Sequence, residues 1–399
     1  MNKVMNKQLP ELVALITREM TSREDKKEHW AAFKKHHNDK LCALLGIDPR
    51  WEIPAGSLIG FDVDPDRKLI LLNYSATAHN LLHEIKGGWS PQLRAMRGLV
   101  YSYEIPGQVK GVRLASRGFE KFFNQSELPE TSLERLFKVT GDMPFLCTAK
   151  EDGHMIEYFM HQRQLCSTTR GKLGTPSANS ALKMIQRSTF IKAQVIAKRR
   201  GQDLMTLVCE FIHPDTRVHV DYGGKKKLFL LEAYDTQGKE VGRHVLVEIA
   251  HELEDYFALP EVCRMSLEGL LSEINDRSVQ NKEGWVAQIP TPGGEFRRVK
   301  FKYISYIGEM VKSKLSYKYL MNCIKNERLD YMLITLPEEI RNVAYSMVDE
   351  VAALTHEDGY QPLYELYTPA EGGRDYYRTV CRAYWRYVQN VIKESNQKI

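Results

Sequence analysis

The sequence predicts a mixed α+β fold of mostly antiparallel strands, followed by an all-helical C-terminal domain. Between about residue 55 and residue 308, short β-prone apolar runs are separated by turns that contain proline or glycine. These runs do not alternate regularly with helical patterns, which disfavours a parallel βαβ architecture. After residue 308, apolar residues recur at helical spacing instead. We therefore expect one domain over residues 1–310 and a second over residues 311–399.

The first domain is expected to begin with a helical segment over residues 1–50, in which Leu9, Leu12 and Ile16 recur at helical spacing. Further helical patterns cover residues 177–200 and 244–256. Strands are expected in the runs GSLIGFDVDPDRKLILLNYS, GLVYSYEI, GVRLASR, HMIEYFMH, TLVCEFIH, KLFLLEAYD, EGWVAQIP and RRVKFKYI. The expected result is a set of antiparallel sheets with flanking helices.

The composition has a mild basic excess and no sign of export. The chain has 56 Lys+Arg against 51 Asp+Glu, a net charge of +5, which permits a polyanionic partner without requiring one. Its seven cysteines include no CxxC pair, so neither a disulfide framework nor a structural zinc site is expected. There is no secretory signal and no apolar run of membrane-helix length. We expect a cytoplasmic monomer in a reducing compartment, with no membrane partner.

A lysine stands at the edge of a β-prone run in the tetrad KEDG, where Lys150 precedes Glu151, Asp152 and Gly153. Taken alone, this tetrad is typical of a solvated lysine before an Asp-Gly hairpin turn. No GxGxxG or GxxxxGK[ST] pattern offers another nucleotide site. The alternative interpretation, in which the Lys150 amine does chemistry, depends on residues elsewhere in the chain.

Four charged residues on later strands supply possible partners. Glu210 lies inside an apolar run, where an unpaired carboxylate is rare, and Glu283 directly precedes the GWV run. Lys300 and Lys302 alternate with apolar residues and so share one strand face. Each has an ordinary alternative: Glu210 could pair with an internal lysine, and the lysines could protect an edge strand. Together they describe one site, with a central lysine, metal-binding carboxylates and cations for phosphate.

This order of motifs resembles that of covalent nucleotidyltransferases, the superfamily of polynucleotide ligases and mRNA capping enzymes. The closer resemblance is to the RNA ligase 1 family of T-even phages, through RAMRGLVYSYE, LASRGFEKFFNQSEL and CEFIHPDTRVHVDY. Gly118 stands where that family usually has proline. The resemblance covers roughly residues 90–310. It implies an ATP-grasp-like adenylyltransferase domain over 1–310 and RNA selection by the helical domain 311–399.

The resemblance also implies a role for each matching residue. Lys150 would be the nucleophile that takes AMP from ATP, and Glu210 and Glu283 would bind Mg²⁺ or Mn²⁺ together with the nucleotide. Lys300 and Lys302 would contact the phosphates and assist catalysis. Further nucleotide contacts are implied for Arg97, Lys121, Glu151, Gly153 and Arg170. Tyr306 falls where the family has a tyrosine, which suggests a place near the RNA or behind the site.

The chemistry sets a requirement on the nucleophile. A lysine amine must lose its proton before it attacks phosphorus, and its ordinary pKa is about 10.4. We expect burial, Lys300, Lys302 and the metal to lower the pKa of Lys150. Asp152 would oppose this shift if it pointed at the amine, but alternation along the strand predicts that it does not.

The implied reaction seals RNA in three steps. Lys150 takes AMP, the AMP passes to a 5′-phosphate RNA end, and a 3′-hydroxyl then displaces it. Cleaved tRNA is one expected substrate. No kinase or phosphatase motif is visible, so a separate protein would heal other kinds of RNA end. If the protein is phage-encoded, these steps would take place in the host cytoplasm.

Three rival interpretations remain. A capping-type guanylyltransferase would use GTP, and a DNA ligase would act on DNA. Both usually carry an OB domain after the final lysine motif, whereas helical patterns follow it here. A catalytically inactive RNA-binding relative would not need the lysine and carboxylates that this chain retains.

Overall fold

A computed structural model of the chain describes residues 5–21, 26–84, 88–291 and 293–315, with isolated stretches between 319 and 348. The chain divides into two compact units. The first comprises Met1–Ile274 and Asn281–Phe301, and the second comprises Asn275–Gln280 and Lys302–Ile399. The second unit contains α11 (Ile304–Lys314).

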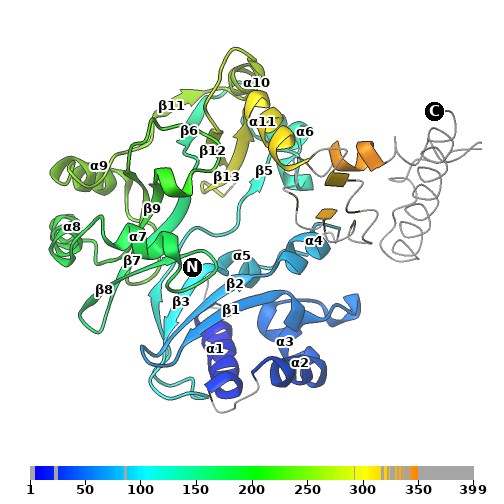
Figure 1. Cartoon of the computed structure of the whole chain (residues 1–399), viewed down its shortest axis with the longest axis vertical. Coiled ribbons are helices and arrows are strands. Elements are labelled where there is room, and N and C mark those ends of the chain that lie inside the picture. Colours follow the sequence, from blue (N-terminus) through cyan, green and yellow to red (C-terminus); the bar gives the residue numbers. More distant parts are fainter. Residues whose placement is uncertain are drawn as a thin grey trace, which may run out of the picture. The chain divides into compact units, whose positions relative to one another are not determined.

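The first unit is built around three β-sheets (Figure 1). Two of them are antiparallel, with strand orders β1-β2-β3-β4 and β10-β9-β7-β8, and the third has the order β11-β6-β12-β13-β5. In the third sheet β13 runs parallel to the short β5. The strands are β1 (Ile59–Asp64), β2 (Leu69–Tyr74), β3 (Arg97–Ser102), β4 (Arg113–Ser116), β5 (Phe123–Asn124), β6 (Phe145–Lys150), β7 (His154–His161), β8 (Gln164–Thr169), β9 (Leu204–Ile212), β10 (Lys227–Asp235), β11 (Val262–Met265), β12 (Gly284–Pro290) and β13 (Phe296–Lys302).

Helices cover the outer faces of these sheets. Figure 1 shows α1, α2 and α3 gathered beside β1, and α8 and α9 beside β9. The α-helices of the first unit are α1 (Met5–Thr21), α2 (Lys26–His36), α3 (Asn38–Leu45), α4 (Ala76–Glu84), α5 (Pro91–Ala95), α6 (Leu133–Thr140), α7 (Pro176–Leu182), α8 (Arg187–Arg199), α9 (Arg243–Glu252) and α10 (Leu267–Asn275). Short 3-10 turns lie at η1 (Pro49–Trp51), η2 (Ala55–Ser57), η3 (Pro129–Thr131) and η4 (Pro214–Thr216).

Each helical layer buries an apolar stripe against a sheet. The stripe of α1, with Leu9, Leu12 and Ile16 fully buried, packs in one core with Ile70 and Leu72 of β2. A second core joins α8 and α9 to β9 and β10. It includes Phe190, Ile249, Leu207 and Leu230. Burial of such side chains stabilises each by about 1.5–3 kcal/mol relative to exposure.

The prediction of an α+β fold with antiparallel sheets is confirmed. Within the segment 1–50 that was expected to be helical, the described residues contain α1, α2 and α3. The helices expected over 177–200 and 244–256 correspond to α7, α8 and α9. The all-helical domain predicted over residues 311–399 lies mostly outside the described residues, so it stays a prediction. Among the described residues, no helix has both the length and the apolar character needed to cross a membrane.

Candidate active site

Lys150 and Glu283 are brought together by the pairing of β6 with β12. Lys150 ends β6 and stands opposite Gly284, the first residue of β12. Glu283 directly precedes that partner, and its Oε2 lies 2.7 Å from Lys150 Nζ. The Lys150 side chain is 23% exposed, whereas Glu283 is 5% exposed. The lysine is therefore open to a substrate while its carboxylate partner is enclosed.

The KEDG turn packs directly onto β9, which brings Glu210 to the same place. Gly153 N donates a hydrogen bond of 3.1 Å to Glu210 Oε1. A Cβ at Gly153 would collide with the carbonyl oxygen of Phe211, so only glycine fits this approach. The predicted association of Lys150, Glu210 and Glu283 is thus a feature of the structure.

The two acids of the KEDG turn are held on the side of the 213–225 loop. Asp152 Oδ2 accepts hydrogen bonds of 2.8 Å from the backbone amides of His219 and Val220. Tyr222 Oη donates to Glu151 Oε2 at 2.9 Å and accepts from Asp152 N at 2.8 Å. These bonds anchor the turn, and they give Glu151 a structural partner that the sequence did not reveal. A cavity of about 260 Å³ borders the turn on this side.

The charge state of Lys150 differs from the prediction. Burial acts to lower the pKa of Lys150, as expected, but the carboxylates of Glu283 and Glu210 outweigh it and raise that pKa above its ordinary value. Asp152 adds to this rise through its charge, although it is bonded elsewhere. Burial and the nearby Glu283 raise the pKa of Glu210 to about 7, despite the opposing effect of Lys150. The substrate-free site therefore holds Lys150 as an ammonium.

Arg97 and Lys300 form the cationic side of the site, and both lie close to the ring of Phe122. The Arg97 guanidinium lies 5.6 Å and Lys300 Nζ lies 4.9 Å from the centre of the Phe122 ring. Burial, together with the charges of Lys121, Arg97 and Lys150, lowers the pKa of Lys300 well below its ordinary value. This concentration of cations suits a polyanionic ligand.

Lys121, a predicted phosphate contact, lies in a buried aromatic cage. Its Nζ is 4.4 Å from the ring centre of Phe123, 5.2 Å from that of Trp89 and 5.5 Å from that of Tyr74. It also forms a 3.3 Å ion pair with Glu127, and both side chains are at least 96% buried. Lys121 is therefore enclosed, and its charge acts on the site by lowering the pKa of Lys300.

Tyr74, which was not predicted as a site residue, interacts with three of the predicted cations. Arg170 Nη1 donates a 3.2 Å hydrogen bond to Tyr74 Oη. Burial acts to raise the pKa of Tyr74, but the cations Lys121, Arg170 and Arg97 together lower it below its ordinary value. Tyr74 ends β2 and is buried, so the sequence pattern identifies it only as a core residue.

The other two predicted residues belong to the second unit. Lys302 Nζ lies 5.6 Å from the ring centre of Tyr306. Both are described with that unit, so their place in the site stays a prediction.

Glu157 carries a buried carboxyl that interacts electrostatically with Arg97, and it was not predicted from the sequence. It is fully buried on β7, and its Oε2 accepts a 2.6 Å hydrogen bond from Ser116 Oγ. A Cβ at Gly98 or at Gly118 would meet Glu157 Oε1. The glycine found at 118 in place of the family's usual proline thus makes room for this carboxyl. Burial raises the pKa of Glu157 to about 8, although Ser116 and nearby arginines act to lower it.

We expect Glu157→Gln to remove a pH dependence of stability. The unfolded carboxyl loses its proton near pH 4.5, but the folded one keeps it to about pH 8. The free energy of unfolding should therefore fall between these values, by up to about 1.4 kcal/mol per pH unit. Urea unfolding across this range should show a steeper slope in the wild type and in Glu268→Gln, an exposed control, than in Glu157→Gln, where other buried carboxyls such as Glu210 still contribute. An equal slope in all three would mean that Glu157 is ionised when folded.

The carboxylates of Glu210 and Glu283 fit a divalent cation that arrives with a phosphate ligand. Among the described residues, no group of three or more histidine, cysteine, aspartate or glutamate side chains forms a complete metal site. Magnesium bound with nucleotides usually takes one or two carboxylates, and phosphates and water complete its shell. Two carboxylates facing one lysine provide that number of protein ligands.

Several known proteins are similar to this chain. A provisionally named RNA ligase of Thermovibrio ammonificans is 28% identical over 201 residues, 50% of this chain and 48% of that protein. The chain thus spans about half the length of this curated relative. An archaeal ATP-dependent RNA ligase covers 81% of this chain and 84% of its own, at 13% identity and a TM-score of 0.46. A Naegleria gruberi RNA ligase mutant with ATP and Mn covers 47% and 55%, at 15% identity and a TM-score of 0.35.

An RNA ligase family model matches residues 95–306, which is more than half of the chain. The matched range begins just before Arg97 and contains Lys150, Glu210, Glu283 and Lys300, the residues gathered in the candidate site. The chain therefore belongs to this RNA ligase family of the nucleotidyltransferase superfamily.

Proposed function

We propose that this protein is an ATP-dependent RNA ligase that joins a 5′-phosphate to a 3′-hydroxyl through a lysyl-AMP intermediate. The observation that carries the proposal is the position of Lys150 Nζ, 2.7 Å from Glu283 and under the influence of Glu210. Arg97 and Lys300 provide the cationic surface that a triphosphate requires. A nucleophile, carboxylates for metal and cations for phosphate are the groups that nucleotidyl transfer uses.

In the first step, the Lys150 amine attacks the α-phosphorus of ATP. The new N–P bond forms as the bond to the bridging oxygen breaks, and pyrophosphate leaves with its electron pair. The ammonium must first give up a proton and leave its ion pair with Glu283. Both changes require that the negative charge facing Lys150 be reduced when ATP binds.

Glu210 and Glu283 would hold Mg²⁺ or Mn²⁺, which when bound neutralises both carboxylates and part of the phosphate charge. Arg97 and Lys300 would bind the triphosphate oxygens. The negative charge of the phosphates would in turn keep Lys300 protonated. The Gly153–Glu210 hydrogen bond fixes the KEDG turn and so orients the Lys150 side chain for attack.

The AMP then passes from Lys150 to the 5′-phosphate of RNA, and a 3′-hydroxyl displaces it to seal the strand. We infer that cleaved tRNA is among the substrates and that residues 311–399 help to select it. Ends of other chemistry would need a separate kinase or phosphatase. We place this repair activity in the cytoplasm, of the host if the protein is phage-encoded.

The test is to incubate the chain with Mg²⁺ and either ATP or GTP labelled at the α-phosphate, and then with 5′-phosphorylated RNA. We expect covalent AMP on the protein, followed by sealed RNA when a 3′-hydroxyl strand is added. Single-stranded RNA, nicked duplex and cleaved tRNA would rank the substrates. Covalent GMP without AMP would indicate a guanylyltransferase, and no covalent nucleotide would indicate an inactive RNA-binding relative.

A further inference from the structure

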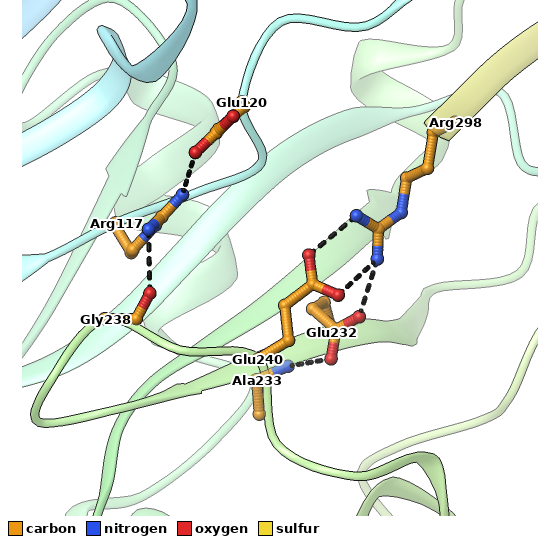
Figure 2. A network of polar contacts seen from close by, with 7 residues as sticks. All are labelled: Arg117, Glu120, Glu232, Ala233, Gly238, Glu240 and Arg298. Atoms are coloured by element: carbon orange, nitrogen blue, oxygen red, sulfur yellow. Dashed lines mark hydrogen bonds and ion pairs between the residues drawn. The ribbon is translucent and has the colours of Figure 1, made fainter. Parts of the chain in front are cut away.

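Arg298 on β13 is held by two carboxylates, Glu232 on β10 of another sheet and Glu240 just beyond that strand. Its Nη1 lies 2.6 Å from Glu240 Oε1, and its Nη2 lies 2.9 Å from Glu240 Oε2 and 3.0 Å from Glu232 Oε2 (Figure 2). Glu232 Oε1 accepts a further hydrogen bond of 3.1 Å from Ala233 N. The Arg298 side chain is 14% exposed and that of Glu232 is 9% exposed. Such an enclosed bidentate pair is far more rigid than a surface ion pair.

These contacts join segments that are distant in the sequence. Arg298 belongs to the five-stranded sheet, whereas Glu232 lies on β10 of a four-stranded sheet and Glu240 follows it after a turn. The Arg298 guanidinium also lies 4.9 Å from the ring centre of Phe119, two residues before Lys121. Arg298 thus connects β13 both to β10 and to the segment that carries Lys121 and Phe122.

A second arginine holds the same turn from its other side. Arg117 Nη1 donates a 2.7 Å hydrogen bond to the carbonyl of Gly238, and its Nη2 pairs with Glu120 at 3.1 Å (Figure 2). Its guanidinium also lies 4.7 Å from the ring centre of Tyr234. The turn between β10 and Glu240 is therefore fixed at two points, which makes it a firm support for Arg298.

The position of Arg298 matters because Lys300 lies two residues further along β13. Alternation places both side chains on one face of the strand, while Val299 and Phe301 are buried on the other. Burial and the charges of Lys121, Arg97 and Lys150 disfavour the protonated form of Lys300, so a charged Lys300 would push this strand away from those cations. An attractive contact on the same face of β13 offsets that repulsion.

We propose that Arg298, held by Glu232 and Glu240, is a positioning residue that keeps Lys300 in the phosphate-binding side of the site. The proposal rests on the proposed function for its catalytic consequence. Its structural consequence, the location of the Lys300 amine, is independent of the proposed function. Loss of the Arg298 contacts lets β13 relax away from the other cations and moves Lys300 toward solvent.

The first test measures Lys300 directly, without any enzymatic activity. An amine-reactive reagent is applied to the wild type, Arg298→Ala and Glu240→Gln, and modification of each lysine is quantified by mass spectrometry. The reaction is followed over a range of pH. We expect the pH at which Lys300 becomes reactive to rise in both variants toward that of the exposed Lys192, while Lys192 itself does not change. Arg297→Ala, which changes the neighbouring arginine on the opposite strand face, is the matched control. Unchanged Lys300 reactivity in folded Glu240→Gln would overturn the proposal.

The second test is a double-mutant cycle on the rate of covalent AMP formation at saturating ATP. Arg298→Ala should slow the wild type about tenfold but have little further effect on Lys300→Ala, because the two residues act as one unit. Equal slowing in both backgrounds would mean a general structural role and would overturn the positioning role. If the wild type forms no covalent AMP, the proposed function fails. The reactivity test on Lys300 still shows whether Arg298 fixes the position of the Lys300 amine.

Discussion

Lys150→Ala is expected to abolish covalent AMP formation completely, because it removes the amine that lies 2.7 Å from Glu283. Lys150→Arg should be equally inactive. Its guanidinium keeps a positive charge for Glu283 but stays protonated and cannot attack phosphorus. The two variants separate chemistry from folding. Lys150→Ala leaves the 95% buried Glu283 without its 2.7 Å partner and should lower the midpoint of thermal unfolding, whereas Lys150→Arg should preserve it.

The measurement is the transfer of α-labelled AMP to each purified protein, with thermal unfolding recorded in parallel. Lys192→Ala, at an exposed position on α8, is the control and should label like the wild type. Labelling of Lys150→Arg at the wild-type level would show that another residue accepts the nucleotide.

Glu283→Gln is expected to slow AMP transfer by about 100-fold or more, while the chain remains folded. The amide keeps the size of the side chain and can still accept a hydrogen bond from Lys150, but it is a poor ligand for Mg²⁺. The concentration of Mg²⁺ that gives half the maximal rate should therefore rise. Both quantities come from single-turnover labelling over a series of Mg²⁺ concentrations.

Glu261→Gln is the matched control for this substitution. Glu261 is close in sequence to β11 and pairs with Lys282, the residue before Glu283, but its side chain is 63% exposed and the ion pair is long, at 3.8 Å. We expect its labelling rate and Mg²⁺ dependence to match the wild type. A Glu283→Gln variant with an unchanged Mg²⁺ dependence would remove this carboxylate from the metal site.

Local sequence patterns were sufficient for the main elements of the site. Apolar, β-prone runs identified the strands that carry Lys150 and Glu210, and alternation identified the strand of Lys300. The residue types and their order suggested that they meet. Short helices such as α4, α5 and α10 were missed because a helix of two turns contains too few residues to show a clear period. The order of strands within each sheet could not be predicted either, since it depends on contacts between segments that are distant in the sequence.

The charge state of Lys150 could not be predicted for a related reason. Alternation indicates which face of a strand a side chain occupies but not what stands opposite it, so the ion pair with Glu283 was not foreseen. Glu283 and Glu210 raise the pKa of Lys150 in this structure, and the fall expected from the cations and the metal together stays a prediction. Arg298 gave no distinctive signal within RRVKFKYI, because its partners Glu232 and Glu240 come from another sheet. Glu157 appeared only as one polar residue in an apolar strand.

The central claim is that the Lys150 amine carries the nucleotide. The most direct test is to incubate the wild type with ATP and Mg²⁺, digest it under conditions that preserve the phosphoramidate bond, and locate the AMP by peptide mass spectrometry. We predict a single modified site, Lys150, within the segment TAKEDGHMIEYFMH. AMP on Lys121, Lys300 or any other residue, with Lys150 unmodified, would contradict the account.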